Sequence, residues 1–84
     1  MSVGETLKQQ RLRLGIDLES LSQDTRIRRQ YLEAIEADQP EGCPGRFFYR
    51  SFVRQYAEEV GLNPEEIEAG IRDTPAVTER AGHP

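Results

Sequence analysis

The first segment of the chain has the apolar spacing and the end signals of an α-helix. Leu7 and Leu14 stand seven residues apart, which places them on one face of a helix. Ser2 followed by Glu5 has the form of a capping box, in which each side chain satisfies a free backbone amide. Gly15 supplies a left-handed stop. The pattern therefore predicts a first helix between Ser2 and Gly15.

A short second helix is predicted after Asp17, because its carboxylate can accept hydrogen bonds from first-turn amides. Leu18 and Leu21 are the expected inward residues of this helix, which is expected to end near residues 24–25. Ile27 lies in the short connection that follows, and we expect it to fill the interior there as an apolar plug.

A third helix is predicted over residues 28–37, because Tyr31, Leu32 and Ile35 have i, i+1, i+4 spacing. Only a few residues separate it from the second helix. The two helices, packed on the first, therefore have a helix-turn-helix arrangement. Residues 38–45 follow with two prolines and two glycines, a composition that is typical of a loop.

A fourth helix is predicted from about residue 46 to residue 60, with Gly61 after its end. Asn63, Pro64 and Glu66 stand in the order of an N-cap, a first-turn proline and an N3 acid, so a fifth helix opens there. The fifth helix continues through its apolar residues, Ile67 and Ile71. Four residues of the fourth helix are its predicted core: Phe47, Val53, Tyr56 and Val60.

The expected fold class is all-α, a compact five-helix bundle that contains a helix-turn-helix. Strand-like alternation of apolar and polar residues is absent from the sequence. We expect one helix-turn-helix domain over residues 1–72. Residues 73–84 have no periodic apolar face, and we predict a disordered tail or the stub of a linker.

Composition narrows the function classes. The chain has 84 residues, of which 36% are hydrophobic and 31% charged, and its mean hydropathy is −0.72. A single cysteine, Cys43, excludes an intramolecular disulfide, and one histidine, His83, leaves little for metal or triad chemistry. We therefore expect a cytoplasmic protein that is no enzyme, with no catalytic or metal-ligating residue and no cofactor.

The net charge of −4 argues against wholesale nucleic-acid binding, but the charges are unevenly placed. Basic side chains gather in the first part of the chain, and acidic ones dominate after Tyr56. A phosphate backbone could therefore approach only the first part.

The helix-turn-helix offers one candidate function, which is sequence-specific DNA binding by a transcription regulator. In readers of this class the second helix enters the major groove with its N-terminal residues at the base edges. The corresponding residues are Arg28, Arg29 and Gln30, with Arg26 at the turn. Glu33 lies one turn beyond Arg29 and repels phosphate unless the two side chains pair. Ordinary surface arginines at a helix N-terminus are the competing interpretation.

Several motifs resemble known families. Gly4-Glu5-Thr6-Leu7-Lys8, then Arg11, then Gly15-Ile16, are similar to the first helix of Xre/Cro-type (lambda-repressor-like) helix-turn-helix domains. Tyr31-Leu32-Glu33-Ala34-Ile35-Glu36 is similar to their third helix. Pro44-Gly45, then the F-x-R-x-F-x-R-x-Y-A pattern over residues 48–57, then Gly61-Leu62, resembles the N-terminal cytoplasmic domain of RodZ-like bacterial cell-shape proteins. The resemblance covers residues 4–71.

The RodZ-like resemblance implies a different partner, the bacterial actin homologue MreB. It implies a contact centred on two aromatics of the fourth helix, which match Phe48 and Phe52. Aromatic residues beside arginines are favoured at protein interfaces, so we expect Arg50 and Arg54 to flank this contact and meet an acidic partner. The competing interpretation is that these aromatics belong to the core.

The Xre-like resemblance also implies a structural ion pair between Arg11 and Glu36. RodZ-like proteins continue through a linker into a membrane-spanning helix, and no run within these 84 residues is long and apolar enough to be that helix. The chain is therefore expected to be either a part of a longer, membrane-anchored protein or a stand-alone relative. The second case would favour the DNA-binding regulator.

Overall fold

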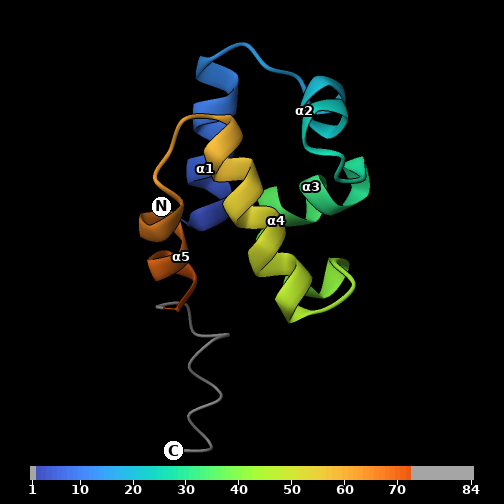
Figure 1. Ribbon diagram of the computed structural model, residues 1–84, viewed down its shortest axis with the longest axis vertical. Coiled ribbons are helices and arrows are strands. Elements are labelled where there is room, and N and C mark those ends of the chain that lie inside the picture. Colours follow the sequence, from blue (N-terminus) through green and yellow to red (C-terminus); the bar gives the residue numbers. More distant parts are fainter. Residues whose placement is uncertain (1, 73–84) are drawn as a thin grey trace, which may run out of the picture.

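The computed structural model describes residues 2–72, which form five α-helices and one short 3₁₀ turn (Figure 1). The predicted tail, residues 73–84, lies outside the described residues. The described part contains no strand, as the sequence predicts. The elements are α1 (Val3–Arg13), α2 (Leu18–Thr25), α3 (Arg29–Glu36), η1 (Pro40–Gly42), α4 (Arg46–Glu59) and α5 (Pro64–Arg72).

α1, α2 and α5 begin at side chains that accept hydrogen bonds from the first turn, whereas the N-caps of α3 and α4, Arg28 and Gly45, make no such bond. Ser2 Oγ accepts from the amide of Glu5 at 3.1 Å, which is one half of the predicted capping box. Asp17 Oδ1 accepts from the Ser20 amide at 2.7 Å, and this bond lowers the pKa of the Asp17 carboxyl. Asn63 Oδ1 likewise accepts at the start of α5. The predicted helix ends are correct within one or two residues.

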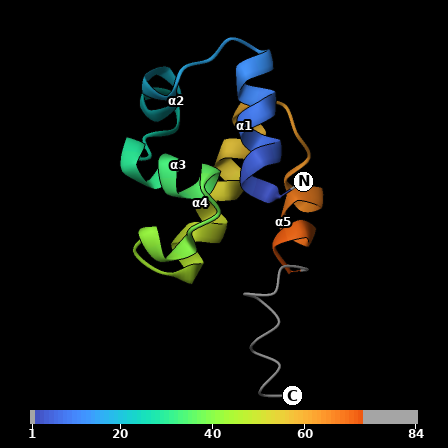
Figure 2. The same ribbon diagram turned by 180° about the vertical axis from the view of Figure 1, so that it is seen from behind.

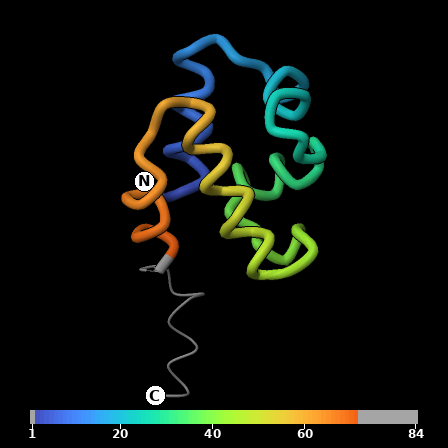
Figure 3. The backbone as a smooth tube through the Cα atoms, viewed as in Figure 1, coloured from blue at the N-terminus to red at the C-terminus, as the bar shows by residue number. Residues whose placement is uncertain are grey.

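α4 runs through the middle of the molecule and organises the other helices around it (Figure 1). α5 packs beside α4, while α2 and α3 contact it elsewhere. Seen from behind, α1 lies in front of α4 and contacts α3 and α5 (Figure 2). The described chain therefore begins beside its last helix, α5, as the backbone trace shows (Figure 3).

The core is built from residues at helical spacing on the inward faces of the helices. Val53, Tyr56 and Val60 of α4 are buried, as predicted, and so is Ile27 in the turn between α2 and α3. Tyr49 extends the inward face of α4 by one turn. The largest fully buried side chains are Leu7, Leu21, Leu32, Ile35, Val53, Tyr56 and Val60.

Two predictions about the core are wrong. Phe47 is 75% exposed, because the buried residues Tyr49, Val53 and Tyr56 define one face of α4 and Phe47 lies outside it. Leu14 does not share the buried face of Leu7, since it stands at the end of α1 and is half exposed. The loop before α4 also contains the 3₁₀ turn η1, which the composition did not predict.

A polar network crosses the interior between α1, α3 and α4. Arg11 Nε donates to Glu36 Oε2 at 2.7 Å, and a second nitrogen of the same guanidinium donates to Glu36 Oε1 at 3.2 Å. The hydroxyl of Tyr56 donates to the same carboxylate. Burial, and then this hydrogen bond, raise the pKa of Tyr56. Arg11 also donates to the carbonyl of Ile16, so the network fixes the chain after α1.

The start of α1 approaches α3 more closely than a side chain would allow. The amide of Gly4 donates to Asp38 Oδ1 at 2.8 Å, so a residue just beyond α3 caps α1. A Cβ atom on Gly4 would lie 2.2 Å from the carbonyl oxygen of Ile35 and 2.8 Å from that of Glu36. Glycine is therefore required at this helix crossing.

Candidate protein-docking site on helix α4

The outer faces of α4 carry the predicted protein-binding residues. Buried residues occupy one face of the helix, so neighbouring positions project around the rest of its circumference. Phe48 is 46% exposed. Phe52, one turn later, is half-buried and packs against the core. The structure thus places Phe48 at the surface, with Phe52 forming the base beneath it.

Four aromatic rings form a continuous series, which we call the aromatic row: Tyr31 of α3 and Phe52, Phe48 and Phe47 of α4. Tyr31 stacks on Phe52 with ring centroids 5.6 Å apart, and Phe52 lies 5.9 Å from Phe48. Phe48 meets Phe47 edge to face at 5.4 Å. Because the inner rings rest on the core, the outer rings are held in place at the surface.

Arg50 and Arg54 also lie on α4, and both bind one carboxylate of α5. Arg54 donates to Glu68 Oε1 at 2.8 Å, and Arg50 donates to Glu68 Oε2. These bonds, that of Arg50 first, lower the pKa of Glu68. The side chains of Arg50 and Arg54 remain 46% and 40% exposed, and each guanidinium has further N–H donors besides the one that binds Glu68.

Sequence reasoning missed two residues of this site, Glu68 and Phe47. Glu68 stands 14 residues after Arg54, and no local spacing joins the two positions; only the packing of α5 along α4 brings them together. The exposure of Phe47 could have been predicted from the sequence, because Tyr49, Val53 and Tyr56 already form one inward face of the helix.

The residues of the DNA-binding alternative lie at the surface around the start of α3. Arg26, Arg28, Arg29 and Gln30 are all exposed. Arg26 ends α2 in the left-handed conformation, and Arg28 is the N-cap of α3. The guanidinium of Arg29 pairs with Glu33 at 3.1 Å and lies 3.7 Å from Glu19. Carboxylates therefore offset part of the positive charge on the face that would meet phosphate.

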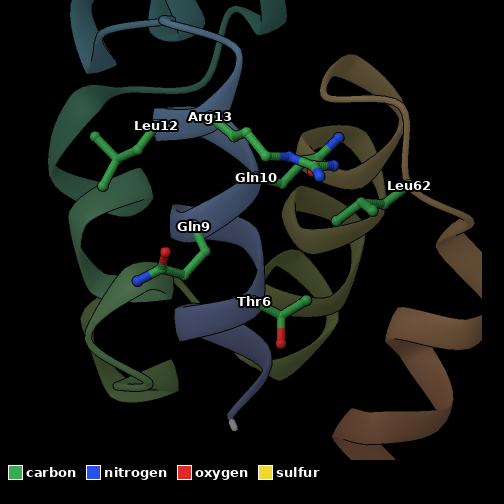
Figure 4. Close-up of a pocket in the computed structure, with 6 residues that line it drawn as sticks. All are labelled: Thr6, Gln9, Gln10, Leu12, Arg13 and Leu62. Carbon is green, nitrogen blue, oxygen red and sulfur yellow. The ribbon is translucent and has the colours of Figure 1, made fainter.

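A second hollow, of about 550 Å³, lies beside α1 and reaches Leu62 after the end of α4 (Figure 4). Gln10 closes one side of it by donating to the carbonyl of Val60 at 2.9 Å, and Arg13 donates to Gln10. The two side chains project toward Leu62, away from Leu12 (Figure 4). Within residues 2–72, no group of His, Cys, Asp and Glu side chains could hold a metal ion.

Cys43 is buried beside η1. Its burial raises the pKa of the thiol and so disfavours the reactive thiolate.

The fold and its outer surface define a small helix-turn-helix domain, in which α2 and α3 are the paired helices. A family model described as "Helix-turn-helix domain" matches residues 6–67, and the chain belongs to this family. Within it, the chain is a RodZ-like domain: it is 38% identical over 66 residues to "Cytoskeleton protein RodZ" of Streptococcus pneumoniae. That match covers 79% of this chain and 24% of the relative.

A second relative is the "Uncharacterized membrane protein YmfM" of Bacillus subtilis, which is 38% identical over 52 residues. This match covers 62% of the chain and 18% of the relative. The chain thus spans about a fifth to a quarter of the curated relatives it matches. No solved structure matches the chain. In the part that the structure describes, no helix is long and apolar enough to cross a membrane.

Proposed function

We propose that this domain is a non-catalytic docking module that binds an MreB-like actin filament through α4 in bacterial cell-shape control. The observation that carries the proposal is the aromatic row, which presents Phe48 at the surface on a base formed by Phe52 and Tyr31. Rigid aromatic anchors of this kind contribute much of the binding free energy at protein interfaces.

Arg50 and Arg54 supply the charge in this proposal. Each guanidinium donates through one nitrogen to Glu68, and its other N–H groups can donate to a carboxylate of an acidic partner. The name of the pneumococcal relative, a cytoskeleton protein, supports a filament as the partner. The name of the Bacillus relative, a membrane protein, supports a cytoplasmic domain to which a membrane anchor is attached in the full-length protein.

The test is co-sedimentation of the domain with polymerised MreB. Phe48→Ala is expected to weaken binding tenfold or more, because truncation of a central aromatic anchor typically costs ~2 kcal/mol or more. Phe48→Ala, Phe52→Ala is expected to abolish sedimentation. Leu12→Ala is the matched control, since it also truncates a half-exposed apolar side chain but lies on α1. A double variant that keeps its circular dichroism spectrum and binds like the wild type would falsify the proposal.

DNA binding by α3 is the second candidate, and the exposed Arg28, Arg29 and Gln30 at its N-terminal end favour it. The same domain is titrated with duplex DNA at two salt concentrations. A DNA reader loses affinity steeply as salt rises, and Arg28→Ala, Arg29→Ala weakens it further. DNA binding with these properties and no binding to MreB would replace the docking proposal with the regulator.

A further inference from the structure

A second surface of α4 lies beside the aromatic row and faces α5. It is a groove of about 310 Å³ lined by Phe47, Arg50, Ser51, Arg54 and Glu68, and we call it the Phe47 groove. Its volume is at the lower end of the range for ligand sites, ~300–1,000 Å³, and suits one or two side chains of a partner. Phe47 and Phe48 are consecutive residues and therefore point about 100° apart around the helix.

The side chains that line the Phe47 groove indicate what kind of group it can bind. Among the large hydrophobic side chains within residues 2–72, that of Phe47 is the most exposed. Arg50 and Arg54 converge on Glu68, so the three charges sum to +1 and the two guanidinium groups are held side by side. Glu68 is largely covered, and the guanidinium groups lie outside it. The outer wall of the groove thus offers N–H donors, the Ser51 hydroxyl and an aromatic ring.

We infer that the Phe47 groove receives an acidic side chain of the partner protein, next to an apolar residue that contacts Phe47. The charge complementarity supports this occupant, because the net positive triad attracts a carboxylate and the exposed ring requires an apolar cover. Glu68 acts as a positioning residue that aligns the two arginines. The inference rests on the proposed function, and it adds that the partner contacts α4 on two faces.

The experiment uses a matched pair of variants at Ser51, which lines the groove together with the two arginines. Ser51→Asp adds a carboxylate to the lining of the groove and cancels the net positive charge of the triad, so MreB co-sedimentation is expected to weaken about tenfold. Ser51→Asn has a similar size without the charge, and its affinity stays within about twofold of the wild type. Equal losses in the two variants, or no loss in either, would overturn the inference.

The two proposals fail separately. If binding to MreB is lost in Phe48→Ala, Phe52→Ala but unchanged in Ser51→Asp, the docking function is supported and the proposed role of the Phe47 groove is refuted. If the wild type does not bind MreB, the groove is tested directly with the peptide acetyl-Leu-Glu-Leu-Glu-amide by amide-resolved NMR. Shift changes confined to residues 47–54 and 68, and absent with the Leu-Gln-Leu-Gln peptide, support the groove. Changes elsewhere, or equal changes with both peptides, refute it.

Discussion

Replacement of Arg11 by methionine is expected to remove a large part of the stability of the fold. The substitution keeps the apolar stem of the side chain and deletes the guanidinium. Three hydrogen bonds are lost with it, two to Glu36 and one to the carbonyl of Ile16. Only the hydroxyl of Tyr56 would then remain on the Glu36 carboxylate.

The expected cost follows from burial. The side chains of Arg11 and Glu36 are only 8% and 9% exposed, so Arg11→Met leaves an uncompensated carboxylate away from water. Breaking a buried pair from one side costs ~3–5 kcal/mol. A chain of 84 residues has a total free energy of unfolding of ~4–13 kcal/mol at ordinary values per residue. The variant is therefore expected to lose from about a quarter to all of its free energy of unfolding.

Urea unfolding followed by circular dichroism measures the change in the free energy of unfolding. Arg29→Met is the matched control, because the same substitution there breaks ion pairs whose partners are more than half exposed. It is expected to cost less than about 1 kcal/mol. Arg11→Met, Glu36→Gln removes both charges and is expected to recover most of the loss. An Arg11→Met variant as stable as Arg29→Met would show that the interior pair does not stabilise the fold.

Three further perturbations test the packing and the titrating groups. Gly4→Ala is expected to lower the free energy of unfolding by about 1–3 kcal/mol, because its Cβ would meet the carbonyl of Ile35; a variant with an unchanged urea midpoint contradicts this contact. Burial raises the pKa of Tyr49 from 10.0 to about 12, so the stability that its neutral form provides is complete below pH 10 and is lost as pH rises toward 12. Tyr49→Phe should therefore reduce the fall in melting temperature between pH 10 and pH 12. Equal falls in the variant and the wild type would contradict this role of Tyr49. The pKa of Glu68 is lowered below its ordinary value of 4.5, so its contribution is present above pH 4.5 and is lost as pH falls through the lowered value. Glu68→Gln should reduce the acid dependence of the melting temperature, which would stay steep if the pairs with Arg50 and Arg54 did not form.

The helix boundaries could be predicted from the sequence because the signals that set them are local. Asp17 binds an amide three residues ahead, and Gly15 and Gly61 have positive φ angles after α1 and α4. The exposure of Phe47 was predictable in principle but was predicted wrongly. Its hydrophobic side chain suggests the core, but Tyr49, Val53 and Tyr56 already occupy the buried face of α4.

The remaining features depend on contacts between distant segments. Glu68 joins Arg50 and Arg54 only because α5 folds back along α4, and the sequence separation of 14–18 residues gives no periodic signal. The same holds for Asp38, which caps α1 from a position 34 residues away. The pattern of residues thus predicts the elements, whereas the groove between α4 and α5 appears only when these elements are packed.

The hydrogen bonds that Arg50 and Arg54 donate to Glu68 also bear on how the domain would respond to mechanical tension. α5 is the last described helix, and Glu68 lies about one turn before its end. A pull on the C-terminal end of α5 therefore acts first on the buried side chain of Ile71 and then on the bonds of Glu68. If tension peels α5 from α4, the two arginines lose the carboxylate that aligns them, and the Phe47 groove loses one of its walls. Displacement of α5 would thus open the groove, even if the aromatic row on the other side of α4 stayed in place.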